Sequence, residues 1–255
     1  MMSMQTHLFR CLSDNYGVLV HDPDSGQTAS IDVPEEAAVR AALGDTGWTL
    51  THILITHHHN DHIGGLAGLK APGITVVGPR KDAARIPGLD VLVGEGDAFS
   101  FGGEEVKVFE TPGHTSGHIT YWMPKAKLVF AGDTMFAMGC GRLFEGTPAD
   151  MWSSLSKIAA LPPETKVFCG HEYTLSNAKF AVTADPDNAA LKARLAEVEK
   201  KTAAGIPTVP TTVAEELATN PFVRANTDEV AAAMGMPGAS PEKVLGEVRA
   251  RKDSF

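Results

Sequence analysis

One short segment constrains this chain more than any other, the run Thr56-His57-His58-His59-Asn60-Asp61-His62, which directly follows a brief apolar stretch. Side chains two residues apart in an extended chain share one face, so His57 and His59 can reach one metal ion. Asp61 and His62 lie beyond the predicted strand and just before Gly64-Gly65, where glycine lets the chain turn freely and direct them to a neighbouring ion. The segment therefore predicts part of the ligand set for each of two metal ions.

Three further positions share one arrangement, in which a candidate ligand follows an apolar strand and a glycine: His114, Asp133 and His171. If these strand ends lie along a common edge, the ligands converge on rigid supports. The predicted first ion is held by His57, His59 and His114, and the second by Asp61, His62 and His171. Asp133 is predicted to bridge, because a carboxylate has two oxygens and can span metals about 3.5–4 Å apart.

The donor set contains histidine nitrogens and carboxylate oxygens but no thiolate. Such donors suit zinc, iron or manganese and argue against a closed structural zinc site. Two dications carry about +4, against about −2 from two carboxylates and about −1 from a bridging hydroxide, so the site can bind an anionic transition state. A water shared by two such ions loses its proton at about pH 7. We expect two divalent ions, zinc before iron or manganese.

The other histidines have weaker settings. His58 lies between two ligands and is expected to point the opposite way, as a packing or supporting residue. His118 either orients a ligand by hydrogen bonding or is simply buried in the core. His7, His21 and His52 are assigned no role.

The composition is that of a globular protein with an acidic surface: 255 residues, 43% hydrophobic, 21% charged, with a formal net charge of −9. That charge repels polyphosphates and argues against nucleic acid as a partner. No apolar run approaches a membrane span and no signal-peptide layout is visible, so we expect no membrane partner. The three cysteines are odd in number and widely spaced, which predicts incidental or buried thiols and a cytoplasmic location. A monomer is expected.

Residues from about 5 to 173 alternate between strands, turns and short helices. Strands are expected at 16–21, 27–33, 74–77, 106–110, 118–123, 127–131 and 166–169, and helices at 34–43, 63–69 and 149–160. After residue 174 strand-like runs disappear, and alanine- and leucine-rich stretches predict helices at 188–203, 212–218, 228–234 and 241–251. We therefore predict a strand-rich catalytic domain at 1–173 and a small helical domain at 174–255.

The metal-ligand pattern resembles that of the metallo-β-lactamase superfamily. That resemblance implies an α+β fold, a four-layer αβ/βα sandwich with a two-metal site on one edge. Further segments are similar to the glyoxalase II (hydroxyacylglutathione hydrolase) family: 111–118, 139–147, 169–174, Asn220-Pro221-Phe222-Val223-Arg224 and the chain end at 249–253. The resemblance covers essentially the whole chain.

The resemblance implies hydrolysis of S-D-lactoylglutathione to D-lactate and glutathione, in the disposal of methylglyoxal. In that expectation a metal-bridging hydroxide attacks the thioester carbonyl, and Asp61 binds the second metal and helps orient the attacking water. The residues implied to hold glutathione are Arg142, Phe144, Tyr173, Arg249 and Lys252. Phe144 stands where many family members carry tyrosine, and Arg142 where lysine is common. Both departures affect glutathione affinity and not the hydrolytic step.

Two alternatives stay open on the sequence. One is a glutathione persulfide dioxygenase, an iron enzyme that generally lacks a helical C-terminal domain. The other is a non-catalytic, metal-dependent protein that binds glutathione conjugates without cleaving them. A flavodiiron-type oxidoreductase is disfavoured, since it has a glutamate where this chain has Asn60-Asp61. A nuclease is disfavoured by the net charge, and a secreted β-lactamase by the absence of a signal peptide.

Overall fold

The structure is a computed structural model that describes residues 3–255. It divides into two compact units, unit 1 with Met1–Glu110 and Gly117–Gly132, and unit 2 with Thr111–Ser116 and Asp133–Phe255. The predicted boundary at 173 and 174 does not coincide with the division between these units, and it stays a prediction.

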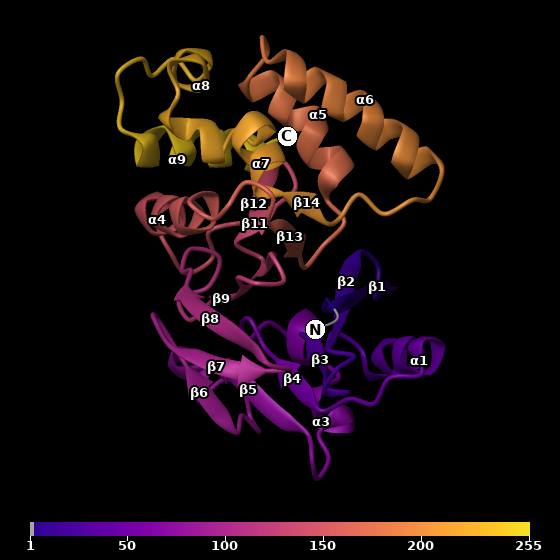
Figure 1. Cartoon of the computed structure of the whole chain (residues 1–255). Helices are drawn as coiled ribbons and strands as arrows, with labels where there is room; N and C mark the ends of the chain where they lie inside the picture. Colours follow the sequence, from indigo (N-terminus) through magenta and orange to yellow (C-terminus); the bar gives the residue numbers. More distant parts are fainter. Residues whose placement is uncertain (1–2) are drawn as a thin grey trace. The chain divides into compact units, whose positions relative to one another are not determined.

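The first sheet of unit 1 has the strand order β1-β2-β3-β4-β5-β6 (Figure 1). Its strands are β1 (Gln5–Cys11), β2 (Asn15–His21), β3 (Thr28–Ile31), β4 (His52–Leu54), β5 (Thr75–Pro79) and β6 (Val91–Val93). The first three pair antiparallel, and β3 to β6 pair parallel. Because β4 is central and parallel to both neighbours, its C-terminal end lies at one sheet edge together with the ends of β3 and β5.

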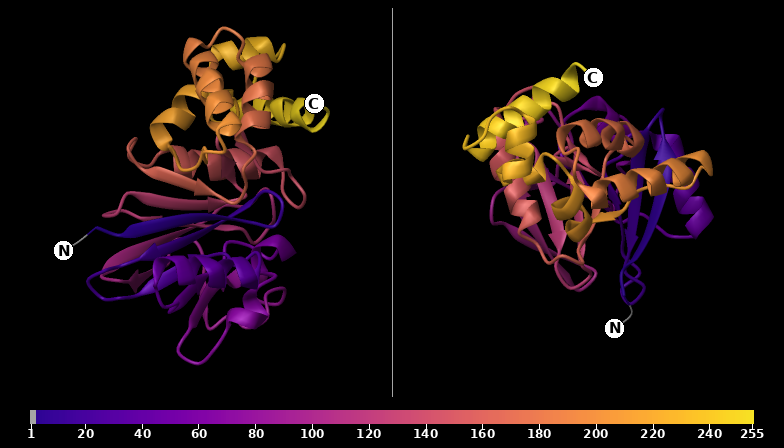
Figure 2. Two further views of the ribbon diagram at one scale, coloured as in Figure 1. Left: turned by 90° about the vertical axis from the view of Figure 1, so that its right-hand side faces the viewer. Right: turned by 90° about the horizontal axis from the view of Figure 1, so that it is seen from above.

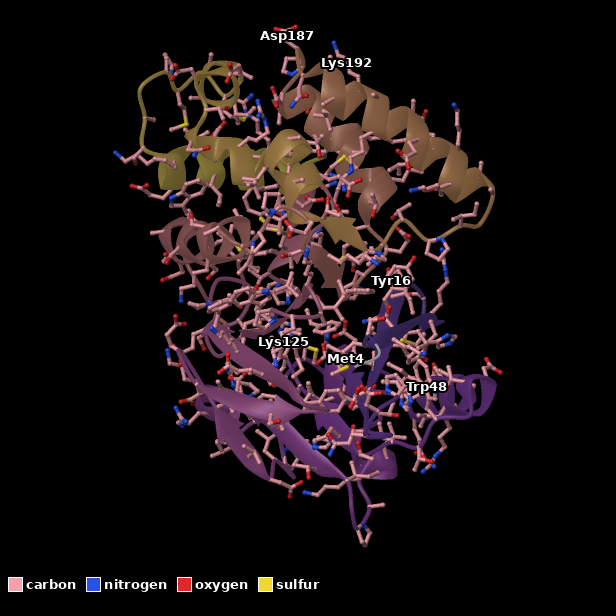
Figure 3. All side chains as sticks on the ribbon, viewed as in Figure 1. Met4, Tyr16, Trp48, Lys125, Asp187 and Lys192 are labelled. Atoms are coloured by element: carbon pink, nitrogen blue, oxygen red, sulfur yellow. The ribbon has the colours of Figure 1, made fainter. Side chains whose placement is uncertain are left out.

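Helix α1 (Glu36–Thr46) covers this sheet with an apolar face. Its Val39 packs with Leu19 of β2 and Ile53 of β4, and all three are fully buried. The helix ends at Thr46, and the residue that caps it, Gly47, has a φ of 72° and donates its N–H to the Leu43 carbonyl. Trp48 follows directly and stacks on His21 at 4.6 Å between ring centroids (Figure 3).

The remaining strands of unit 1 form an antiparallel ladder in the order β10-β9-β8-β7. They are β7 (Ala98–Phe101), β8 (Glu104–Glu110), β9 (Ile119–Met123) and β10 (Leu128–Gly132). Three short helical segments complete the unit: α2 (Asn60–Ile63), α3 (Leu66–Leu69) and η1 (Arg80–Asp82).

Unit 2 is mainly helical. Its helices are α4 (Pro148–Ala159), α5 (Thr174–Ala184), α6 (Ala189–Ala203), α7 (Val213–Thr219), η2 (Val223–Asn226), α8 (Asp228–Ala233) and α9 (Pro241–Asp253). The antiparallel pairs β11 (Met135–Phe136) with β12 (Gly139–Cys140), and β13 (Lys166–Cys169) with β14 (Thr211–Thr212), supply its strands. In both views of Figure 2 the orange-to-yellow helices gather into one bundle.

Helices α5 and α6 lie side by side and bury a small core with Met138, Ala178 and Leu191 among its members (Figure 1). The turn between them carries the exposed Asp187, and Lys192 lies on the first turn of α6 (Figure 3). Local caps fix where α4 and α7 begin. Thr147 and Thr212 each form a capping box with an acidic residue three positions later.

Most predicted elements are confirmed, including α4, α6, α7, α9 and β13 within one or two residues. The expected helix at 63–69 is wrong as one element, because α2 and α3 are separate short helices. The expected absence of strands after 174 is also wrong, since β14 pairs with β13. Strands β1, β6 and β7 and helix α5 were not predicted. None of the helices in residues 3–255 combines the length and apolar character that crossing a lipid bilayer requires.

Candidate metal centre

The four candidate ligands of unit 1 leave the first sheet just after β4. His57 and His62 are buried, whereas His59 and Asp61 are partly exposed. Donor atoms of His57 and His59 lie within 4.8 Å of each other, as do those of Asp61 and His62. His62 Nε2 lies 3.6 Å from Asp61 Oδ2. Unit 1 thus places the two predicted pairs in one short segment.

The expected free turn at Gly64-Gly65 is wrong. Asp61 and His62 lie on α2, and both glycines have helical backbone angles, with φ of −58° and −84°. A Cβ on Gly64 would lie 2.8 Å from the Asn60 carbonyl oxygen, and one on Gly65 would lie 2.6 Å from a backbone nitrogen. Glycine is required here for close backbone packing and not for turning.

Asp32, directly after β3, fixes the tautomer of two candidate histidine ligands, and this role was not predicted. Its buried carboxylate accepts from Thr56 N at 2.7 Å, from Thr56 Oγ1 at 2.9 Å and from His62 Nδ1 at 2.8 Å. Because the Thr56 hydroxyl donates to Asp32, it accepts from His57 Nδ1, 3.0 Å away. Both rings therefore carry their proton on Nδ1 and present the Nε2 lone pair as the metal donor.

Asn15 holds Asp61 in a comparable way. Its buried side chain donates to the Asp61 backbone oxygen and to Asp61 Oδ2, each at 3.1 Å. The only local signals for this role were the position of Asn15 at the start of a strand and its polarity. Its partner lies 46 residues away in the sequence.

His118 and His58 have different surroundings. His118 is fully buried and stacks on His57, with ring centroids 4.9 Å apart, so it packs against a candidate ligand. His58 Nδ1 instead lies 3.0 Å from the buried carboxylate of Asp82, which Arg85 also contacts. Neither Asp82 nor Arg85 is a candidate ligand, so the packing or supporting role of His58 stays a prediction.

In unit 2 two candidate ligands, His114 and His171, lie next to the carboxylate of the third, Asp133. His114 Nε2 lies 3.4 Å and His171 Nε2 lies 3.3 Å from Asp133 Oδ2, and all three side chains are buried. The Nδ1 of His114 donates to the Arg142 carbonyl at 3.0 Å, because a carbonyl can only accept. His114 therefore also presents Nε2 as its donor atom.

The residues implied to bind glutathione all lie in unit 2. Phe144 is 62% exposed and meets the His114 ring edge to face at 5.2 Å. Tyr173 is 37% exposed and stacks on His171 at 4.7 Å with nearly parallel planes. The ring of each of these aromatic side chains thus contacts the ring of a candidate metal ligand.

The three cations lie close together. Burial lowers the pKa of Lys252, and the charges of Arg249 and Arg142 lower it further. Lys252 Nζ donates to Ser176 Oγ at 3.0 Å. Arg249 is buried and donates to the Cys140 carbonyl at 2.9 Å, so it also has a structural role. Asp253, which was not predicted, lies 2.9 Å from Arg249 and 3.7 Å from Arg142.

The cysteines are buried, as predicted, and none of the three is in a disulfide. Burial raises the pKa of Cys11 to about 12, of Cys140 to about 11 and of Cys169 to about 12. A cysteine acts as a nucleophile or as a metal ligand only in its thiolate form, and these three thiols stay protonated at neutral pH. This protonation agrees with the predicted donor set, which contains no thiolate.

Comparison with known proteins identifies the family of this chain. Residues 24–171 match the family model of the metallo-beta-lactamase superfamily, and residues 172–255 match that of the hydroxyacylglutathione hydrolase C-terminus. A hydroxyacylglutathione hydrolase of Rhizobium meliloti is 55% identical over 100% of both chains, and one of Maricaulis maris is 54% identical over 97% of both. The chain belongs to the hydroxyacylglutathione hydrolase family. The predicted family and the metallo-β-lactamase fold are confirmed.

Solved structures agree with this fold. The crystal structure of ETHE1 from Myxococcus xanthus superposes with a TM-score of 0.66 over 99% of both chains at 27% identity. That of BLEG-1 B3 metallo-beta-lactamase gives 0.65 over 86% of this chain and 99% of its own, at 22% identity. Hydroxyacylglutathione hydrolases are metallo-hydrolases, and the histidine and aspartate donors described above fit a divalent metal site.

Proposed function

We propose that this hydroxyacylglutathione hydrolase cleaves the thioester of S-D-lactoylglutathione to D-lactate and glutathione. The observation that carries the proposal is 55% identity over the full chain to a protein named for this activity. Relatives of that name favour the hydrolase over a persulfide dioxygenase and over a non-catalytic binding protein. The donor set supports the same class of reaction.

The proposed ligand sets are those that the sequence predicts. His57, His59 and His114 would hold one divalent ion, Asp61, His62 and His171 a second, and Asp133 both. The support for this assignment is that three of the histidines, His57, His62 and His114, have Nδ1 occupied by a hydrogen bond, so Nε2 is the donor atom. We propose zinc in both positions, with iron or manganese as alternatives, since nitrogen and oxygen donors suit all three.

When bound, a pair of divalent ions supplies a nucleophile from water at about neutral pH and stabilises negative charge on a carbonyl oxygen. The chain supplies the orientation. Asn15 donates to the Asp61 backbone oxygen and to one carboxylate oxygen, and would thereby hold the partly exposed carboxylate in one orientation for metal binding. The departing thiolate needs little protonation, because thiols are far more acidic than alcohols.

The substrate is an anion, and the proposed contacts are cationic or aromatic. We propose that Arg142 and Lys252 pair with glutathione carboxylates, in an otherwise acidic protein. Arg249 is held by Cys140 and Asp253, so we propose that it acts mainly by its charge. Tyr173 and Phe144 would contact the peptide with their exposed ring faces.

The test is thiol release from S-D-lactoylglutathione by purified protein, beside elemental analysis of bound metal. We expect release to rise in proportion to metal content. Metal-loaded protein that is inert toward this and related thioesters would favour the binding protein. The same preparation tests the proposed monomer by light scattering, and fractionation of cells tests the proposed cytoplasmic location, which the three unpaired thiols support.

A further inference from the structure

A short hairpin in unit 2 connects two parts of the proposed site. Strands β11 and β12 contain two residues each, and Met138 between them has a φ of 53°, a left-handed conformation that a side chain rarely adopts. A two-stranded hairpin of this length is not stable by itself. Its conformation must therefore be imposed by its surroundings.

Buried side chains of unit 2 form hydrogen bonds with five backbone groups of this hairpin. Asn220 Nδ2 donates to the Gly139 carbonyl at 2.9 Å and to the Phe136 carbonyl at 3.3 Å. Asn177 Nδ2 donates to the Ala137 carbonyl at 3.2 Å. Glu216 Oε2 accepts from Met138 N at 2.8 Å, and Arg249 Nη1 donates to the Cys140 carbonyl at 2.9 Å.

Glu216 is the centre of this arrangement. Its side chain is 1% exposed, and Arg194 pairs with its Oε1 at 2.7 Å. The Thr211 hydroxyl donates to the same oxygen at 2.7 Å. Its Oε2 accepts from Met138 N and from Asn220 Nδ2, the latter at 2.9 Å. One carboxylate thus ties α6, β14, the end of α7 and the hairpin together.

The hairpin leads at both ends into the proposed ligands. Asp133 precedes it, and Gly141 N after it donates to the Thr134 carbonyl at 3.2 Å. A Cβ on Gly141 would lie 2.1 Å from the Asp133 carbonyl oxygen, so the two ends are in close contact. The carbonyl of Arg142 then accepts from His114 Nδ1. Movement of the hairpin would therefore move Asp133 and release His114.

We infer that Glu216 is a positioning residue for the metal centre, acting through the β11–β12 hairpin on Asp133 and His114. The helical C-terminal segment then does more than contact substrate, because it sets the geometry of two metal ligands. The inference rests on the proposed assignment of those ligands and goes beyond it, since Glu216 touches neither metal nor substrate.

The test is Glu216→Gln, which keeps the shape of the side chain. An amide has one acceptor oxygen and one NH2 group, so a donor would face either Arg194 or Met138 N. The matched control is Glu215→Gln, one residue earlier, whose carboxylate accepts from Thr212 N at 2.8 Å and caps α7. A glutamine serves in a capping box as well.

The measurements are metal retained per chain against a fixed concentration of chelator, kcat, KM and the thermal midpoint. We expect Glu216→Gln to lower metal retention about tenfold and kcat by at least as much, since outer partners of metal ligands have effects of that size. Glu215→Gln should match the unmodified protein. Asn177→Ser, which removes only the contact to the Ala137 carbonyl, should give a smaller loss in the same direction.

Folded Glu216→Gln with unchanged metal retention and kcat would overturn the inference. If that variant does not fold, unchanged values for Asn177→Ser would overturn it equally. Failure of the proposed function has a different signature: the unmodified protein would release no thiol, while its metal retention would still depend on Glu216.

Discussion

The two compact units support their candidate metal ligands by different means. In unit 1 a single buried carboxylate, that of Asp32, fixes the tautomer of His62 directly and that of His57 through Thr56. In unit 2 the partner of His114 is a backbone carbonyl, and the position of that carbonyl depends on a loop. Unit 2 also carries all five residues assigned to substrate. Changes in unit 1 should therefore affect metal binding and kcat, whereas changes in unit 2 can also affect KM.

The largest expected effect is that of Asp133→Ala in unit 2. Removing the bridging carboxylate should leave folded protein whose kcat falls by about a thousandfold or more, because neither ion keeps its shared ligand. Thiol release and circular dichroism check activity and folding. Substantial turnover in this variant would refute the bridging role of Asp133 and would weaken the contrast between the two units.

Asp32→Asn in unit 1 should lower metal affinity by about 10–100-fold. Asn tolerates the left-handed backbone at this position, where φ is 54°, so the change isolates the carboxylate. An amide has one acceptor oxygen, so it cannot accept from Thr56 N on one side and from Thr56 Oγ1 and His62 Nδ1 on the other. Metal competition with a chromogenic chelator measures the loss. An unchanged KM for the metal-loaded fraction would sharpen the contrast between the units, and a raised KM would weaken it.

Phe144→Tyr tests whether unit 2 controls substrate affinity. The new hydroxyl adds one hydrogen bond to glutathione, worth about 0.5–1.5 kcal/mol, so KM should fall by about two- to tenfold with kcat unchanged. Steady-state kinetics with S-D-lactoylglutathione measures both constants. An unaltered KM would mean that the exposed ring of residue 144 does not face the peptide.

The smallest effect is expected for Asp253→Asn, which removes a carboxylate from beside Arg142 and Arg249. The cations would then attract a substrate carboxylate more strongly, and KM should fall by about two- to fivefold, as for a partly exposed ion pair. The gain should shrink as salt is added, because salt screens exposed charges. A salt-independent change would indicate altered packing of α9 instead.

The sequence predicted the candidate ligands because each follows a strand end, where local pattern and chemistry coincide. It did not reveal Asp32, Asn15 or Glu216. Each is a single polar residue with a partner 24 to 78 positions away, so its role exists only after folding. Glu216 in particular occupies an ordinary position in a helical pattern, and nothing local distinguishes it from the exposed Glu215.

The glycines were misread for a related reason. Composition indicates where glycine stands, but only the packed backbone shows whether it is needed for a turn or for space. Gly64 and Gly65 are needed for space between backbone segments, and the preceding Asp61 and His62 lie on a helix. The predicted element boundaries were otherwise close, because caps such as Thr212 and Asn188 are local signals.

The buried cysteines make the protein a poor target for the molecules it is proposed to handle. Burial raises the pKa of the Cys169 thiol to about 12, so this thiol stays protonated at neutral pH, two residues before the proposed ligand His171. Acyl transfer from a thioester to a protein thiol requires the anion, as does exchange with glutathione disulfide. Acyl groups released nearby should therefore pass to water and leave no covalent mark on the protein.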